Sequence, residues 1–422
     1  MIAVLPSCRL AVLSLSLLAC GAGRTGGSAV TRDSAGIAIV DNTGPKWGGA
    51  EAWTVVDTAV LDIGGNDADP LYDLGQVGSA ARLADGQIVV ANGATSEIRY
   101  YGADGRHLAT SGGKGSGPGE YQSISGMMTG PGDSLLVFDV FARRITVLTS
   151  DGKVGRTFSL GGQSGMTLPT DGRMSLAIPA GWFSGGSVLG VVQGFRINDP
   201  RSGSYRDTVA YLRYAADGAA QDTVARLPGV EMEQMSLNFA GQTFSSPAVV
   251  PLGRTTSTAV HGERLYVAQN DHYEIAVRDQ TGRLERLIRV AAEPAPITEE
   301  DKTAHRREQL EQMEGAPGMG MVPEQLKAQM RTRVEQASYP ATFPFVAELH
   351  PDPDGNLWVE EVQRPGGETR RYAVFDPEGV LLGRVILPPR FRPTWVGRDE
   401  IVGVWRDADD VEHVRVYPIR KP

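Results

Sequence analysis

A glycine-rich segment, GGKGSGPGEY at positions 112–121, has a composition that suggests phosphate binding. A phosphate-binding loop needs G-x-x-x-x-G-K-[ST] between a strand and a helix, so that backbone N–H groups face the phosphates. Here Gly115 follows Lys114 where Ser or Thr would be required, and QSISGMMTG after Tyr121 has no helical period. The segment therefore predicts a turn and not a nucleotide site.

Motifs for hydrolysis and for metal binding would be a second indication of catalytic function. The sequence contains neither HExxH nor GxSxG, the common signatures of metalloproteases and serine hydrolases. The segment DPDGN at 352–356 resembles part of a calcium loop, but it lacks the downstream Glu and favours a hairpin turn. Among the segments expected to line a central pore, FVAELHPD offers one carboxylate away from a turn, Glu348, which is too few oxygens for calcium. We therefore predict no metal site and no cofactor.

The N-terminus resembles a bacterial lipoprotein signal. LAVLSLSLL at 10–18 is an apolar run far shorter than a membrane span, and it ends in LLACG, which is typical of the cleavage site before a lipidated cysteine. We predict a signal peptide over 1–19, lipidation of Cys20 and a flexible tether over 20–35. The alternative is an ordinary secretory signal with a chance cysteine. The protein is expected to be exported and lipid-anchored in the cell envelope, on the periplasmic side or the cell surface.

Cysteine usage and charge exclude several other classes of protein. Both cysteines, Cys8 and Cys20, fall in the N-terminal segment, so the folded part must be stable without a disulfide. The 41 Lys and Arg residues and the 50 Asp and Glu residues give a net charge of −9 without a basic block. Nucleic acid is therefore an unexpected partner.

Regularly spaced turns indicate how the remaining chain is organised. Fifty-two glycines and many short β-branched runs favour an all-β fold. Asp-Gly or equivalent pairs, which supply the positive φ of tight hairpins, recur in couples roughly 20 residues apart. Four-stranded units of roughly 40–50 residues with this paired spacing predict the blades of a β-propeller.

The turn pattern predicts six blades over 36–422, with seven as the alternative. The first turns of five complete blades lie near Asp85, Asp133, Asp171, Gly262 and Asp354, and that of the sixth lies at Arg398-Asp399. The third blade is expected to carry an insertion near 182–207. The sixth blade ends one strand short, so AWTVVDTAVLDIGG at 52–65 is expected to supply its outer strand and close the ring.

A family resemblance is carried by the run from Arg99 to Leu160. Its IRYYGADGRHLATSGGKGSGPGEY and LLVFDVFARRITVLTSDGKVGRTFSL resemble the six-bladed β-propeller lipoproteins related to NHL-repeat proteins. These share a G-x-G-P-G-E-[FY] link followed by L-x-V-x-D…R-I-x-V-F…D-G. The match is fainter over 338–420, and the third blade and 297–338 depart from it. The resemblance implies a fold and not an activity, because the family is largely without a defined activity. In addition, function depends on the residues of a particular site and not on the fold.

One segment is strongly helical and is expected to interrupt the blades. Thr298 and Asp301 form a capping-box pattern before TEEDKTAHRREQLEQME, and GAPGMGM separates it from a second helix. We predict a helical insertion over 298–337, between the fourth and fifth blades. It forms either a hairpin resting on the rim or a mobile lid over the pore mouth, with an apolar stripe at Leu326, Met330 and Val334.

The loops at the same end of the propeller supply the candidate site. The residues with ligand-binding potential there are Glu120, Tyr121, Arg143, Arg144, Asn270, Asp271, His272, Glu348 and Arg406. For Glu120 and Tyr121 a structural role in anchoring the next blade is favoured over ligand contact.

The absence of a complete catalytic motif favours a function in binding. We predict a monomeric binding or scaffold module for an envelope protein or a small-molecule or glycan ligand. The alternative is a hydrolase or lyase acting on a sugar or peptide fragment under the helical insertion, through residues such as His272 and Glu348.

Overall fold

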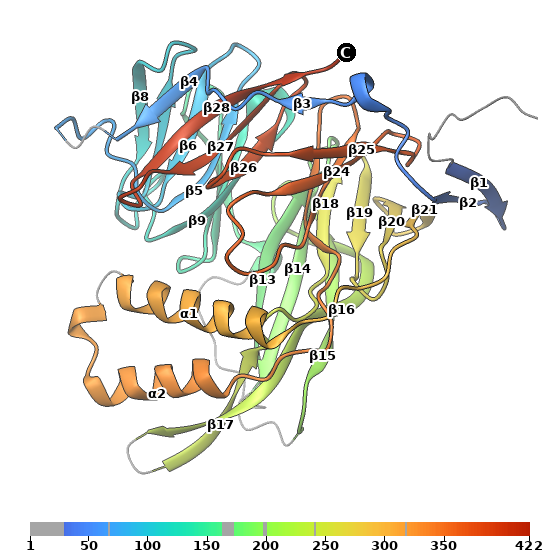
Figure 1. Cartoon of the computed structure of the whole chain (residues 1–422). Helices are drawn as coiled ribbons and strands as arrows, with labels where there is room; N and C mark the ends of the chain where they lie inside the picture. Colours follow the sequence, from blue (N-terminus) through green and yellow to red (C-terminus); the bar gives the residue numbers. More distant parts are fainter. Residues whose placement is uncertain (1–28, 66–67, 163–172, 197–200, 240–241, 317–318) are drawn as a thin grey trace, which may run out of the picture.

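The computed structural model describes residues 29–65, 68–162, 173–196, 201–239, 242–316 and 319–422. Within these residues the chain forms six β-sheets and two α-helices (Figure 1). The first strands of all six sheets line one central hollow, so the sheets surround a common channel. The chain is thus predominantly β and propeller-like, as the turn pattern predicts.

The first three sheets follow the chain in order, and each is antiparallel. The first contains β5 (Val77–Arg82), β6 (Ile88–Asn92), β7 (Glu97–Tyr101) and β8 (His107–Gly112). The second contains β9 (Ile124–Thr129), β10 (Leu135–Asp139), β11 (Arg144–Leu148) and β12 (Val154–Phe158). The third contains β13 (Arg173–Trp182), β14 (Val188–Arg196), β15 (Tyr205–Tyr214), β16 (Ala220–Phe239) and β17 (Gln242–Val249).

Two of the last three sheets, the fourth and the sixth, include strands from the N-terminal part of the chain. The fourth contains β18 (Ser257–His261), β19 (Arg264–Ala268), β20 (Glu274–Asp279), β21 (Leu284–Val290), β2 (Ile37–Asn42) and β1 (Ala29–Ser34). The fifth contains β22 (Val346–Pro351), β23 (Leu357–Glu361), β24 (Arg371–Phe375) and β25 (Leu381–Ile386). The sixth contains β26 (Phe391–Val396), β27 (Glu400–Arg406) and β28 (Glu412–Arg420), with β3 (Thr54–Val55) and β4 (Leu61–Gly64).

The Asp-Gly pairs form tight turns between strands, as predicted. Gly86 and Gly105 have φ values of 92° and 82°, a conformation that glycine adopts without steric cost. The preceding carboxylates of Asp85 and Asp104 each accept a hydrogen bond from the backbone N–H two residues further along. The recurring turn chemistry therefore sets the length of each hairpin.

The predicted closing strand is confirmed. β4 pairs antiparallel with β28, with Ile63 opposite Val414. The side chain of Ile63 is 1% exposed and packs with Leu74, Val414 and Val416 between the first and sixth sheets. A strand from early in the chain and the last strand therefore share one sheet, and β4 covers the edge of β28.

The boundaries predicted for the third blade are wrong. Its first turn lies at 184–187, where Gly186 has a φ of 86°, and not at Asp171-Gly172, which is outside the described residues. The stretch 182–207 is consequently no insertion, because it contains the turn and the second strand β14. The additional structure is instead the long β16 and its partner β17, which project beyond the other sheets (Figure 1).

The predicted tether also extends too far along the chain. Within 20–35, residues 29–34 form β1, which pairs with β2. β2 in turn pairs in parallel with β21, so that Ala38 lies opposite Arg286. These two strands widen the fourth sheet to six strands. The ordered fold therefore begins at Ala29 at the latest.

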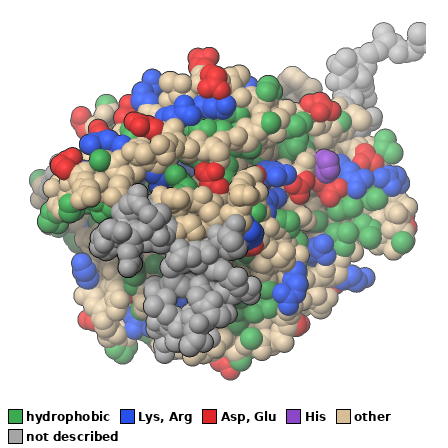
Figure 2. All heavy atoms as spheres, turned by 90° about the horizontal axis from the view of Figure 1, so that it is seen from below, with side chains coloured by type: hydrophobic (Ala, Val, Ile, Leu, Met, Phe, Trp, Pro, Cys, Tyr) green, Lys and Arg blue, Asp and Glu red, His purple; other side chains and the backbone are tan. Residues whose placement is uncertain are grey.

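The helical insertion is a hairpin of α1 (Glu299–Gly315) and α2 (Glu324–Gln336), and we call the pair the helical hairpin. Thr298 caps α1 through the predicted capping box with Asp301. The helical hairpin lies on the side of the sheets on which the β16–β17 tip projects (Figure 1), and we call this side the insertion face. Both signs of charge are interspersed over this face (Figure 2).

The helical hairpin is attached mainly at its base. Arg364 pairs with the buried carboxylate of Asp301, and Ser338 donates a hydrogen bond to Glu233 of β16. The helix α2, all of whose residues are described, buries none of its side chains, and Leu326 is 43% exposed. The predicted apolar stripe therefore makes little contact with the sheets.

Replacement of 299–336 by a short Gly/Ser linker is expected to leave the sheets folded, because their strands pair with one another and not with the helices. In the intact protein we expect fast hydrogen exchange at 315–321 beside slow exchange in the strands, since α2 buries none of its side chains. Mass spectrometry after timed deuteration measures both. Uniformly slow exchange over 299–336, together with global unfolding of the linker variant, would show that the helices belong to the core.

Candidate functional site

The glycine-rich segment positions a core residue. Tyr121 is fully buried between the first and second sheets, and its N–H donates to the Gly113 carbonyl at 2.9 Å. A Cβ on Gly112 would lie 2.7 Å from the Tyr121 ring, so the close approach requires glycine there. Glu120 is exposed, and its carboxylate accepts the N–H of Gly117 at 2.8 Å. The segment is thus a structural turn, and the Tyr121 side chain is not available at the surface.

Two other candidates, Arg143 and Arg144, hold backbone segments together. The Arg144 guanidinium donates to the carbonyls of Ser116 (3.1 Å) and Glu120, which fixes the glycine-rich turn against β11. Arg143 donates to the Ser175 carbonyl of β13 at 2.8 Å. These contacts join neighbouring sheets at the insertion face, and they place neither guanidinium in the groove described below.

Asn270 is also structural. The residue is buried, with 3% of its surface exposed. Its side-chain amide nitrogen donates to the carbonyls of Thr255 and Val346, both at 2.8 Å. Its amide oxygen accepts the N–H groups of Phe345 (3.1 Å) and Val346 (2.8 Å). An Asn side chain has two donors and two acceptor lone pairs, so its capacity is used completely. Asn270 therefore ties the fourth sheet to the fifth.

The remaining charged candidates on loops take part in ion pairs. Asp271 pairs with Arg254 at 2.8 Å, and Arg406 pairs with Glu412 at 2.7 Å. The second carboxylate oxygen of Glu412 accepts the N–H of Val77 at 2.7 Å, which links the sixth sheet to the first. The Asp271 pair lies at the fourth sheet and the Arg406 pair at the sixth. The structure therefore does not assemble the candidate residues into one site.

His272 does line a hollow, and this hollow continues into a larger one. The two have volumes of about 560 Å³ and about 720 Å³ and share Tyr273, Ala292 and Glu293. We call them together the hairpin groove, because the larger one adjoins the base of the helical hairpin at Arg364. The groove runs between the fourth and fifth sheets.

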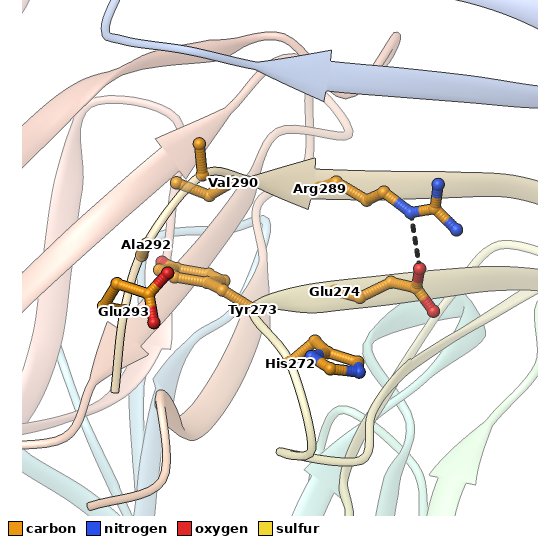
Figure 3. A pocket seen from close by; sticks show the side chains of 8 residues that line it. His272, Tyr273, Glu274, Arg289, Val290, Ala292 and Glu293 are labelled. Atoms are coloured by element: carbon orange, nitrogen blue, oxygen red, sulfur yellow. Dashed lines mark hydrogen bonds and ion pairs between the residues drawn. The ribbon is translucent and has the colours of Figure 1, made fainter. Parts of the chain in front are cut away.

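The smaller part of the hairpin groove is lined by residues directly before β20, by β20 and β21, and by the segment after β21 (Figure 3). Arg289 and Glu274, on adjacent strands, form an ion pair at 2.6 Å on one side. The Tyr273 ring and the Glu293 carboxylate lie on the other side, and His272 lies next to Glu274 (Figure 3). This part of the groove therefore offers a ligand hydrogen-bond acceptors, the carboxylates of Glu274 and Glu293, and a donor, the guanidinium of Arg289.

A buried carboxylate, Glu361, organises the larger part of the groove. Its side chain is 7% exposed and accepts hydrogen bonds from Arg371 (2.6 Å), Arg384 (3.0 Å) and the Tyr273 hydroxyl (3.2 Å). Burial raises the pKa of Tyr273 well above its usual value of 10, so the hydroxyl stays a donor. Two guanidinium groups share one carboxylate here, which leaves a positive charge on the groove wall.

The helical hairpin holds the opposite wall of the groove. Arg364 pairs with Asp301 of α1, and its guanidinium lies 5.3 Å from the centre of the Phe343 ring. The N–H of Gly366 donates to the Glu308 carboxylate of α1. Because residues 363–367 line the groove, movement of α1 would change the shape of this wall.

Glu348 lies beside the central channel and not in the hairpin groove. The channel is a hollow of about 280 Å³ lined by His350, whose Nε2 atom is 3.1 Å from the Glu348 carboxylate. The contact with His350 lowers the pKa of Glu348, although burial opposes this. The buried Glu360 lies close to both residues. His272 and Glu348, on which the hydrolase or lyase alternative depends, are thus in different places.

Several residues of these two sites were missed from the sequence, namely Glu361, Arg371 and Arg384 in the groove and His350 and Glu360 at the channel. One signal was available, because LWVEE places two carboxylates inside an otherwise apolar strand. A charged residue is rarely fully buried unless it has a partner, so such a pair indicates buried ion pairs.

No protein-family model and no curated protein matches this chain. A member of the DUF4221 family from Bacteroides vulgatus is similar in structure, with 12% identity, a TM-score of 0.50, and coverage of 88% of this chain and 99% of that one. An identity this low shows a likeness of fold alone. No helix among the described residues is long and apolar enough to span a membrane.

Two further solved structures are more distant. A protein from Bacteroides fragilis that was inferred to be exported has 12% identity and a TM-score of 0.47, with coverage of 91% of this chain and 99% of that one. A gluconolactonase from Xanthomonas campestris has 14% identity and a TM-score of 0.41, with coverage of 83% and 88%.

Proposed function

We propose that this protein is a lipid-anchored, six-bladed β-propeller of a bacterial cell envelope, related to NHL-repeat proteins, that binds an extended peptide segment of a partner protein in the hairpin groove. The observation that carries the proposal is the groove itself. Its two adjoining hollows of about 560 Å³ and about 720 Å³ form a long depression with room for several residues.

The groove chemistry favours a peptide over a glycan. Arg371 is exposed while it pairs with Glu361, so its remaining N–H groups can donate to the carbonyls or carboxylates of a ligand. Glu293 is exposed and can accept backbone N–H groups. Three of the described aromatic residues line the groove. Tyr273 and Phe343 are 5% and 6% exposed, so only the partly buried Phe345 has a ring that a sugar could reach.

The lipid anchor is proposed from the N-terminal sequence, and its test is independent of the groove. Cys20→Ala is expected to abolish labelling of the protein by a radioactive or alkyne-tagged fatty acid in growing cells. The variant should also move from the membrane fraction to the soluble fraction, because no other covalent lipid would hold it. Unchanged labelling would exclude Cys20 as the lipidated residue.

Peptide binding can be tested before the partner is identified. Peptides selected on the wild-type protein from a random display library are expected to bind Arg371→Glu at least about tenfold more weakly, because a charge-assisted hydrogen bond contributes about 1.5–3 kcal/mol. Arg264→Glu is the matched control, since Arg264 is also a half-exposed, ion-paired arginine but lies outside the groove. Fluorescence anisotropy with labelled peptides gives the dissociation constants.

The control and the variant separate the outcomes. Equal weakening by Arg371→Glu and Arg264→Glu would mean that charge in general, and not the groove, determines binding. Failure to enrich any peptide, combined with binding on a glycan array that Arg371→Glu abolishes, would keep the groove as the site and replace the ligand class.

A further inference from the structure

Three side chains with metal-binding atoms meet at the central channel. Each of Glu348, His350 and Glu360 offers one ligand atom, and these atoms all lie within 4.8 Å of one another. Glu348 and His350 are two residues apart on β22, and Glu360 comes from the paired strand β23. A register shift between Val346 and Leu349 interrupts this pairing, and such bulges change the direction of nearby side chains.

The histidine nitrogen is the first indication that a cation belongs here. The Nε2 atom of His350 is buried and faces the Glu348 carboxylate at 3.1 Å. A ring nitrogen and a carboxylate oxygen at this separation can share either a proton or a metal ion between them. Lone pairs directed at one point are what a metal ion requires.

The second indication is the support of the buried ligand. Glu360 is 3% exposed, and its two oxygens accept hydrogen bonds from Arg370 and from the Tyr372 hydroxyl at 2.7 Å. A carboxylate has about four lone-pair sites, so these two partners leave capacity for a metal. Ligating carboxylates are commonly held by such outer hydrogen bonds. Arg370 pairs with Glu360, and both Arg370 and Arg392 act on Glu348, so a cation at this point would share the two carboxylates with two guanidinium groups.

The surroundings provide space for further ligands. His350 borders the channel hollow of about 280 Å³, which is large enough for several water molecules. The side chain of Glu348, the neighbour of His350, is 54% accessible to solvent. A metal held by three protein atoms at this point would complete its coordination with water from the channel.

We propose that Glu348, His350 and Glu360 bind one first-row divalent cation of the zinc type at the wall of the central channel. One imidazole nitrogen and two carboxylate oxygens form a donor set suited to such ions, and three protein ligands leave at least one position open. Calcium fits less well, because it takes six to eight oxygen ligands. The site is separate from the hairpin groove, so it does not depend on peptide binding.

Titration of the chelator-treated full-length protein tests the site. Isothermal titration calorimetry with Zn²⁺ is expected to show one site per chain, and Co²⁺ should give visible absorption bands of a low-coordinate complex. Glu348→Gln and His350→Gln should each weaken Zn²⁺ binding at least about tenfold, since each removes a ligand atom. Glu274→Gln and His272→Gln are matched controls that remove the same residue types in the hairpin groove, and they should leave the affinity unchanged.

The midpoint of thermal unfolding provides a second measurement of Zn²⁺ binding that is independent of the calorimetric signal. Zn²⁺ should raise the midpoint of unfolding of the wild type and of both controls, but not that of Glu348→Gln or His350→Gln. All four variants should unfold cooperatively without metal, which shows that each is folded. No stoichiometric binding to the wild type, or equal binding by the ligand variants and the controls, would overturn the proposal. Binding of Ca²⁺ in preference to Zn²⁺ would overturn the assigned class of metal.

Discussion

Replacement of Ile63 by alanine is expected to lower the free energy of unfolding by about 2–5 kcal/mol. Ile63 lies on the closing strand β4 and is 1% exposed among Leu74, Val414 and Val416. Its removal leaves a cavity where β4, the last strand β28 and the first sheet meet. Chemical denaturation followed by tryptophan fluorescence measures the loss.

Val60→Ala is the matched control for this prediction. Val60 directly precedes β4 but is 65% exposed, so its truncation should change stability by no more than about 0.5 kcal/mol. If the two variants unfold at the same denaturant concentration, the segment does not close the ring as described. Deletion of 52–65 should be more severe than either substitution, because it also exposes the edge of β28.

Glu361→Ala is expected to lower the free energy of unfolding by about 2–4 kcal/mol. The substitution leaves the buried Tyr273 hydroxyl without its acceptor and deprives Arg371 and Arg384 of their shared partner. The loss stays below that of a fully buried ion pair, because both arginines can turn towards water. It should also weaken the binding of any peptide selected on the wild type.

Glu293→Ala provides the comparison for Glu361. Glu293 lines the same groove but is exposed, so this variant should retain wild-type stability while it weakens peptide binding. A Glu361→Ala protein as stable as Glu293→Ala would mean that the carboxylate is not buried among the groups named here. Denaturation curves at matched ionic strength distinguish the two results.

The strands and turns could be predicted because they depend on local sequence. Asp-Gly pairs such as Asp85-Gly86 specify tight turns by the conformation of glycine and the acceptor of the carboxylate, without reference to the rest of the chain. The closing strand at 61–64 could be predicted because it had no other partner. The capping box at Thr298 was likewise local.

The third sheet was placed wrongly because its first turn lacks this local signature. SGGS at 184–187 forms the first turn without an aspartate, whereas Asp171-Gly172 has the signature but lies outside the described residues. The parallel pairing of β2 with β21 joins segments about 250 residues apart, and no local pattern specifies such a contact. Long-range pairing is therefore where the sequence interpretation failed.

The candidate site was predicted in part, for the same physical reason. His272 could be found because a loop histidine at the insertion face is visible in the sequence. Asn270, next to it, looked equally available, but four backbone groups from two segments use its whole capacity. Glu361 and its arginines come together only through the register of β23, β24 and β25, which the sequence does not show.

The central claim, that the hairpin groove is the ligand site, is tested most directly by hydrogen exchange with and without a selected peptide. The account predicts slower exchange on binding at 290–295 and 361–369, which line the two hollows, and unchanged exchange in the first and second sheets. Arg371→Glu should remove the protection at both segments. Protection confined to the β16–β17 tip or to the channel strands, with 290–295 and 361–369 unchanged, would contradict the claim.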